Sequence, residues 1–356
     1  QMCIRDRNYK DYRYESMSVN TDYGKYSFST DQWIAAPKDP ADLYTRMAYV
    51  RENHWKLTHL LNYNQTFYKH DIGMLLGFEE ERFVKRTTDT AKLGLIDSSV
   101  GDPSSATTPS SISGTGEEFT SRSYFGRINY AFDSRYLFEV NMRYDGSSRF
   151  APDNRWGLFP SFSAGWRISE ERFMKGLPID NLKIRASYGS LGNGNVSPYS
   201  FLELLSISTS GRVLNGLKNK YTSAPAVMPD GLTWETATTT DVGLDFGMLN
   251  NRLQFNGDYY IRKTTDMYTV GETLPDVFGA SSPKGNYADM TTKGWEITLT
   301  WRDQFTLAEK PFNYEIRGTL SDYISTIDRY NNQTGNLDDY YAGKRVGEIW
   351  GYVTEG

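Results

Sequence analysis

A two-residue alternation of apolar and polar side chains, kept up over long segments, constrains this chain more than any other feature of its sequence. In the segment YLFEVNMRY the apolar set is Tyr136, Phe138, Val140, Met142 and Tyr144, and the residues between them are mostly polar or charged. Successive side chains of a β-strand point to opposite faces, so this pattern predicts a strand whose two faces meet different surroundings.

The same alternation recurs along most of the chain. The segments that carry it are residues 57–67, 72–78, 124–132, 136–144, 162–168, 182–188, 242–248, 253–261, 295–301 and 314–320. One or two weaker strands are expected between Tyr9 and Trp33. No segment has a convincing helical period, and no repeat of fixed length is found. The chain is therefore predicted to be all-β.

Tight and long connections between these segments alternate. The tripeptide DSR (Asp133–Arg135) and the dipeptide Asn250–Asn251 are tight, and Asn and Asp tolerate the backbone angles that hairpin turns require. Long polar stretches rich in Ser, Thr, Gly and Pro occupy residues 85–119, 191–232 and 270–289. This order places the tight turns at one end of the sheet and the long loops at the other.

Composition excludes several classes of protein. The mean hydropathy is −0.60 and no run of about 18 apolar residues exists, which excludes a bundle of membrane helices. A net charge of −5 gives no electrostatic reason to expect nucleic acid as a partner. Cys3 is the single cysteine, so a disulfide framework and a cysteine zinc cage are excluded.

Two folds fit the alternation. In a soluble β-sandwich the aromatic faces fill a core, whereas in a transmembrane barrel they face lipid and the charged faces line a wide interior. Alternation lasts for about ten residues or more in several segments, longer than the five or six usual in globular strands. Aromatic residues reach 15%, with 26 Tyr, and Tyr suits surfaces that are apolar at one end and wet at the other. These features together favour the barrel.

Five segments also resemble a known family. They are YAFDSRYLFEVNMRYDGSSRFAPDNRWGLFPSFSAGWRISEERFM, LKIRASYGSLGNGNV, WETATTTDVGLDFGMLNNRLQFNGDYYIRKTTDMY, TTKGWEITLTWRD and GEIWGYVTEG. They resemble, in order, the barrel of SusC/RagA-type TonB-dependent outer-membrane transporters. The resemblance implies an antiparallel up-and-down barrel of about 22 strands in the outer membrane of Bacteroidota, of which about 10–12 lie in this chain.

The resemblance further implies partners and domain limits. The family's barrel is closed by an N-terminal plug, is driven by TonB, and works with a SusD-like surface lipoprotein that captures substrate. The plug, the TonB box and the C-terminal strands are expected to lie outside this sequence. Residues 1–7 lack the alternation and are interpreted as a foreign leader, and residues 8–356 as part of the barrel domain.

Several residues are candidates for sites of chemistry. His54 and His59 are expected on opposite faces of a strand and His70 in a turn, so no metal site is predicted. The segment GNGNV (Gly192–Val196) is interpreted as the start of an outer loop, because no helix follows it to bind phosphate. NNQTGNLDD (Asn331–Asp339) offers oxygens for calcium, but its spacing matches no EF-hand.

The strand carboxylates Glu139, Asp245 and Asp258 could form a hydrolase pair, but a hydrated wall of balanced charges is favoured. The loop aromatics Tyr199, Phe201, Tyr221 and Phe278 could stack on a sugar or a partner, but ordinary loop packing is favoured. No catalytic, cofactor-binding, metal or substrate-binding residue is therefore assigned, and no cofactor is expected.

The resulting functional hypothesis is an energy-coupled importer of oligosaccharides or peptides that performs no covalent chemistry. Two alternatives stay open at this level: a surface adhesion or binding barrel without transport, and a soluble carbohydrate-binding or hydrolase β-domain. Long loops and the missing plug would carry specificity, so these residues do not identify the substrate.

Overall fold

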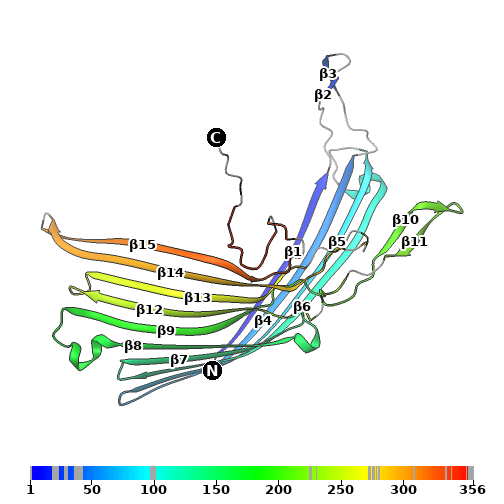
Figure 1. The fold of residues 1–356 in the computed structure, drawn as a ribbon. Helices are drawn as coiled ribbons and strands as arrows, with labels where there is room; N and C mark the ends of the chain where they lie inside the picture. The colour runs from blue at the N-terminus through cyan, green and yellow to red at the C-terminus, as the bar shows by residue number, and fades with distance from the viewer. Residues whose placement is uncertain are drawn as a thin grey trace. The chain divides into compact units, whose positions relative to one another are not determined.

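The structure is a computed structural model that describes residues 2–17, 24–27, 31–35, 43–96, 102–223, 227–229, 231–271, 274, 277, 279, 281–307, 309–332, 335–337, 339–349 and 351. Almost all of its regular structure is β (Figure 1). The helical elements in these ranges are single 3₁₀ turns: η2 (Pro103–Ser105), η3 (Pro152–Asn154), η4 (Ile168–Glu170) and η5 (Arg172–Met174). None of the helices described is long and apolar enough to cross a membrane.

Eleven strands of the described chain form one sheet, in the order β1-β4-β5-β6-β7-β8-β9-β12-β13-β14-β15. Their bounds are β1 (Met2–Met17), β4 (Tyr44–Phe67), β5 (His70–Leu95), β6 (Ala106–Phe132), β7 (Tyr136–Ser147), β8 (Trp156–Arg167), β9 (Ile179–Asn193), β12 (Glu235–Met248), β13 (Leu253–Val270), β14 (Lys284–Leu307) and β15 (Lys310–Arg329). Two separate hairpins pair β2 (Gly24–Ser27) with β3 (Gln32–Ala35), and β10 (Ile207–Leu214) with β11 (Leu217–Thr222). Strand order follows chain order apart from these hairpins, which confirms the predicted up-and-down sheet of 10–12 strands.

The chain divides into two compact units, and β1, β4, β5 and β6 contribute residues to both. The first comprises Gln1–Cys3, His59–Glu79 and Ser121–Gly356, and the second comprises Ile4–Thr58 and Glu80–Thr120. In the first unit, strands β7 to β9 and β12 to β15 lie side by side in antiparallel register (Figure 1).

Tight turns join neighbouring strands at one end of the first unit, as the sequence predicts. Asp133 and Ser134 take positive φ angles of 50° and 54° between β6 and β7. The turn between β12 and β13 is wider than the predicted Asn250–Asn251, because Leu249 and Arg252 belong to it as well. Asn250 and Asn251 also have positive φ angles, and Asn and Asp tolerate this left-handed region. Tyr68, Leu249 and Glu309 adopt it at these turns as well.

The predicted loop at residues 85–119 is wrong in most of its length. β5 continues to Leu95 and β6 begins at Ala106, so strand occupies most of the stretch. The predicted loop at 191–232 likewise contains the hairpin β10–β11, and β14 begins at Lys284, inside the predicted loop 270–289. The added parts of β5, β6 and β14 are mostly polar on both faces and so lose the alternation, while backbone hydrogen bonds between strands continue regardless of side chain.

The interpretation of residues 1–7 as a foreign leader stays a prediction. β1 runs from Met2 to Met17 without a break after Arg7. In the second unit, a small core forms from Leu43, Leu95 and Ala106, and the amide of Leu95 donates to the carbonyl of Leu43 at 3.2 Å.

In the first unit, side chains from separate loops meet beyond the strand ends in a second core, named here the loop-base cluster. Its buried members are Phe150, Val196 and Leu232, with Phe201, Trp234 and Tyr268 packed against them. Phe150 is 0% exposed, and its ring lies 5.0 Å from that of Trp234. The cluster joins the three loops that link β7 to β8, β9 to β10 and β11 to β12, so these loops pack on one shared core.

Candidate functional site

One face of the sheet in the first unit is continuously apolar. Val140 on β7 lies opposite Ile128 on β6 and Phe162 on β8, and Phe138 lies opposite Tyr130. These side chains are partly exposed, and 51% of Phe138 is accessible to solvent. Apolar side chains paired across strands and left uncovered indicate a surface made for an apolar environment.

Aromatic rings mark two levels on this apolar face. Near the tight turns Tyr136 stacks between Phe132 and Trp166, with ring centroids 6.3 and 6.4 Å away. Near the loops Trp156 stacks on Tyr144 at 4.8 Å, and Tyr124 also lies against Trp156. We name these the turn-end and loop-end aromatic levels. Amphipathic rings at two levels are typical of the two interfaces of a bilayer.

The spacing of the two levels fits a membrane. Tyr136 and Tyr144 are eight residues apart on β7, and Trp156 and Trp166 are ten apart on β8. With a rise of about 3.4 Å per residue and a tilt of about 40°, these separations span about 21 and 26 Å along the membrane normal. The apolar band of such barrels is about 25 Å tall. Val140 lies midway between the levels.

The opposite face carries charges that satisfy one another. Arg185 on β9 contacts Asp258 on β13 at 2.7 Å and Asp245 on β12 at 3.2 Å, and Asp241 lies 3.8 Å away. Lys183 approaches Asp245 at 3.8 Å. The side chains are about 16–33% exposed, so this is a hydrated wall with paired charges.

The carboxylates weighed as a hydrolase pair therefore have other partners. Asp245 and Asp258 flank one guanidinium, and Glu139 on β7 accepts a hydrogen bond of 2.6 Å from Asn141, which in turn accepts one of 2.8 Å from Arg127. A hollow of about 630 Å³ lies on this polar face in the first unit. Its lining includes Asp71, Glu139, Ser163, Lys183, Arg185 and Asp241. The arrangement provides a wet, charge-balanced surface.

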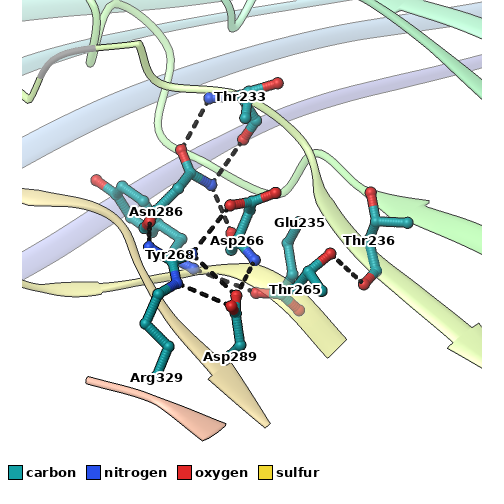
Figure 2. A network of polar contacts seen from close by, with 9 residues as sticks. All are labelled: Thr233, Glu235, Thr236, Thr265, Asp266, Tyr268, Asn286, Asp289 and Arg329. Carbon is teal, nitrogen blue, oxygen red and sulfur yellow. Dashed lines mark hydrogen bonds and ion pairs between the residues drawn. The ribbon is translucent and has the colours of Figure 1, made fainter. Parts of the chain in front are cut away.

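A second polar network ties together four strands at their loop ends (Figure 2). Arg329 on β15 grips Asp289 on β14 with two hydrogen bonds of 2.8 and 2.9 Å, and reaches Asp266 on β13 at 3.0 Å. The Asn286 amide donates to the Thr233 carbonyl at 3.0 Å and accepts from the Thr233 amide at 2.8 Å. The network spans an irregularity in the pairing of β13 and β14, where Asp266 has a φ of 56°.

This network lies beyond the apolar band. On β13 and β14 the apolar face runs up to Ile261 and Trp295, and the next residues on that face are Lys263 and Lys293. Asp289 is six residues past Trp295, towards the loops. The hydrogen bonds from Arg329 hold the pKa of the Asp289 carboxyl below its usual value. The network, with its ionised Asp289 and Arg329, thus holds together the strand ends from which the loops begin.

Arg329→Gln in the full-length protein is expected to lower the free energy of local unfolding of this network by about 1 kcal/mol. This is the upper end of the range for a partly exposed ion pair with bidentate geometry. Amide hydrogen exchange at Asp266 and Tyr268 should then quicken about fivefold at pH 7. Because the pKa of Asp289 is lower in the folded state, its ionised carboxylate stabilises the fold at pH values above the unfolded-state pKa near 3.9. This stabilisation is lost as the pH falls through the folded-state pKa. The difference between variant and wild type should therefore disappear in strong acid.

Arg302→Gln is the matched control, because Arg302 pairs across the same two strands with Glu315 at 2.5 Å but both side chains are about half exposed. Its loss should leave the exchange of Asp266 and Tyr268 unchanged. If both substitutions changed the exchange of these two amides equally, the Arg329 network would not be what holds the strand ends together.

The structure places the three histidines apart. His54 contacts Glu81 at 2.7 Å, while His59 stacks on Phe78. His70 is the first residue of β5 rather than a turn residue, and its ring nitrogen lies 2.8 Å from the Tyr130 hydroxyl. No group of three or more metal-binding side chains occurs among the residues described.

The remaining candidates divide between packed and exposed positions. Val196 of the GNGNV segment follows the end of β9 and is buried in the loop-base cluster, which confirms that a loop starts there. Phe201 packs on the same cluster, whereas Tyr221 on β11 is 53% exposed and Tyr199 39%. Phe278 lies outside the described residues, as do positions 333, 334 and 338 of the segment weighed for calcium.

Sequence reasoning missed the two clusters that organise the loops. Arg329 and Asp289 are 40 residues apart, and neither follows a motif. Phe150 gave a usable signal, because a lone aromatic in the polar stretch SSRFAPDN has no strand face to occupy and needs a pocket.

An up-and-down antiparallel sheet with one lipid-compatible face, one charged face and all tight turns at one end is the wall of a transmembrane β-barrel. The family model described as "TonB dependent receptor-like, beta-barrel" matches residues 5–352. The chain belongs to this family of TonB-dependent receptor barrels.

Curated relatives agree with this assignment. The chain is 35% identical over 230 residues to the TonB-dependent receptor SusC of Bacteroides thetaiotaomicron, covering 63% of this chain and 22% of the relative. It is 34% identical over 238 residues to the TonB-dependent receptor P26 of Formosa agariphila, covering 65% and 23%. The chain thus spans less than a quarter of these relatives. Both organisms belong to the Bacteroidota, as predicted.

A solved structure shows the same fold. The structure of the RagAB peptide transporter matches with a TM-score of 0.77 and 21% identity, covering 92% of this chain and 34% of that chain. The SusC/RagA-type resemblance, the partial barrel and the outer-membrane location are therefore confirmed, and the soluble β-sandwich is wrong. TonB-dependent receptors transport rather than catalyse, which confirms that this chain is not an enzyme.

Proposed function

We propose that the chain forms part of the barrel wall of an energy-coupled importer that carries oligosaccharides or peptides across the outer membrane. The observation that carries the proposal is the two-faced wall itself, apolar towards lipid and charge-balanced towards the interior, in a chain of the TonB-dependent receptor family. A polar solute needs a hydrated path through lipid, and the Arg185 face offers one.

The wall contributes shape and hydration, not bond making. Its paired charges on β9, β12 and β13 lie within ion-pair distance of one another, so the interior surface remains wet without binding any one solute tightly. Movement of substrate then depends on a plug pulled by TonB, a conformational mechanism that needs no catalytic residue here.

The proposed partners are TonB and a SusD-like lipoprotein seated over the long loops. The loop-base cluster and the Arg329 network support this arrangement, because they give the loops a rigid base on which a second protein can rest. The substrate class rests on the relatives: one is named SusC, and the RagAB structure is of a peptide transporter.

The test is uptake by the full-length protein in a host with and without a functional TonB. Fluorescent oligosaccharides and peptides are offered to both strains, and saturable uptake of one class is expected only when TonB is active. Binding at the cell surface without uptake in either strain would instead favour an adhesion barrel. Co-purification of a surface lipoprotein with the barrel tests the partner separately.

A further inference from the structure

The connection between β8 and β9 differs from the other turns at its end of the sheet. The turns Tyr68–Lys69, Asp133–Arg135 and Leu249–Arg252 are two to four residues long, whereas this connection occupies residues 168–178. It contains the 3₁₀ turns η4 and η5 and is drawn as a coiled ribbon where β8 meets β9 in Figure 1.

Glu171 fixes this connection to the lipid-facing side of the sheet. Its carboxylate accepts a hydrogen bond of 2.7 Å from the Tyr136 hydroxyl and one of 3.2 Å from the Trp166 indole, and Arg135 donates to it at 3.2 Å. The bonds from Tyr136 and Trp166 hold the pKa of Glu171 below its usual value, so it stays ionised. Because both rings belong to the turn-end aromatic level, the connection is attached at the membrane interface.

The part of the connection that follows Glu171 exposes apolar and basic side chains together. Phe173 is 67% exposed and Leu177 is 50% exposed. Arg172 and Lys175 alternate with them and are also exposed. In the described part of the chain, no carboxylate lies within 4 Å of either basic group. Neighbouring acids are already paired: Asp133 with Lys69 and Glu170 with Arg167.

We infer that residues 172–177 are a phospholipid-binding anchor. Phe173 and Leu177 enter the boundary between headgroups and acyl chains, while Arg172 and Lys175 bind headgroup phosphates. Two observations select lipid as the partner. The segment is continuous with the lipid-facing aromatic level, and its exposed charges, which form no ion pair within 4 Å among the described residues, are positive whereas phospholipid phosphates are negative. Short turns of such barrels lie on the periplasmic side, so the lipid is in the periplasmic leaflet.

The anchor is a lipid interaction independent of what the barrel transports. Amphipathic segments that lie in the interface insert their apolar side chains by about 5–10 Å. An anchor at this turn also opposes movement of β8 and β9 along the membrane normal. Such a movement would transfer the Phe173 ring from the lipid interface into water.

A labelling experiment tests the depth of the anchor. In the full-length protein with every native cysteine replaced, Phe173→Cys and, as control, Lys310→Cys at the β14–β15 turn are each labelled with bimane in phospholipid nanodiscs. The label at 173 should be quenched by lipids that carry a shallow nitroxide and shielded several-fold from aqueous iodide, whereas the label at 310 should show the reverse. Equal iodide quenching at both sites would overturn the inference and favour a water-facing surface for a soluble partner.

A second experiment tests the phosphate contacts. Folding of wild type and of Arg172→Gln/Lys175→Gln is compared in vesicles with and without phosphatidylglycerol. Each removed charge should reduce the gain from anionic lipid about fivefold. Lys218→Gln/Lys220→Gln on β11 removes the same charge at the loop side and should behave as wild type. A double variant at 172 and 175 with the full gain would overturn the assignment of these two residues to phosphate.

Discussion

Phe150→Ala in the full-length protein is expected to destabilise the loop-base cluster by about 3–5 kcal/mol, the cost of removing a fully buried aromatic ring from a core. Phe150 is 0% exposed and packs with Val196 from the β9–β10 connection and with Leu232 and Trp234 from the β11–β12 connection. Hydrogen exchange at the amides of Val196 and Thr233 measures the loss, because these amides bond to Gly194 and Asn286 respectively. Both should exchange at least about a hundredfold faster.

Tyr221→Ala is the control for removal of an aromatic ring from the same region. Tyr221 is 53% exposed on β11, so its removal should change stability by no more than about 0.5 kcal/mol. Phe150→Leu should fall between the two, since it restores part of the buried volume. If Val196 and Thr233 stay protected in Phe150→Ala, the three loops do not fold on a shared base.

Alternation predicted the faces of the strands well because the two environments of a barrel wall differ within the membrane. On β7 every second residue from Tyr136 to Tyr144 lies on the apolar face, and the pairing of Val140 with Ile128 and Phe162 follows the predicted register. Side chains there are selected by lipid on one side and water on the other, so the contrast is written into the sequence.

The same rule explains where the prediction fails. Beyond the aromatic levels both faces are wet, so Thr, Ser and charged residues suit either side and the alternation disappears. β5 therefore continues through the polar stretch up to Leu95 although residues from Lys85 onwards were predicted to be loop. Strand ends outside the membrane are held by backbone pairing and by long-range contacts such as Arg329 with Asp289, which no local pattern encodes.

The polar clusters were predictable in kind but not in detail. Charges on one face of β9, β12 and β13 had to neutralise each other, and Asp245 and Asp258 do so through Arg185. Which residues pair depends on the register between neighbouring strands. Gly243 on β12 lies opposite Arg185 on β9 and opposite Asp258 on β13, and only the fold shows this register.

Val140→Arg is expected to reduce folding of the full-length protein into lipid vesicles severely. Val140 lies midway between the two aromatic levels, about 10 Å from either along the membrane normal, and an arginine facing lipid at this depth costs about 2–4 kcal/mol. The folded fraction is measured from the difference in gel mobility between boiled and unboiled samples after refolding. The control must place an arginine on the other face at the same depth.

Ser163→Arg is a better control than Asn141→Arg. Asn141 already bonds to Arg127 and Glu139, so an arginine there would break two contacts and meet a like charge. Ser163 on β8 is exposed on the polar face directly opposite Glu139, where an arginine gains a partner and should cost about 0.5 kcal/mol or less.

A third variant separates lipid from a protein core, because arginine would be harmful at Val140 in both. Val140→Trp adds apolar volume, which fluid acyl chains accommodate, whereas overpacking a close-packed interior typically costs about 1–3 kcal/mol. We therefore expect Val140→Trp to fold as well as wild type while Val140→Arg does not. Equal damage from tryptophan and arginine would mean that Val140 is covered by protein, and the apolar face would then be an interface rather than a lipid-facing surface.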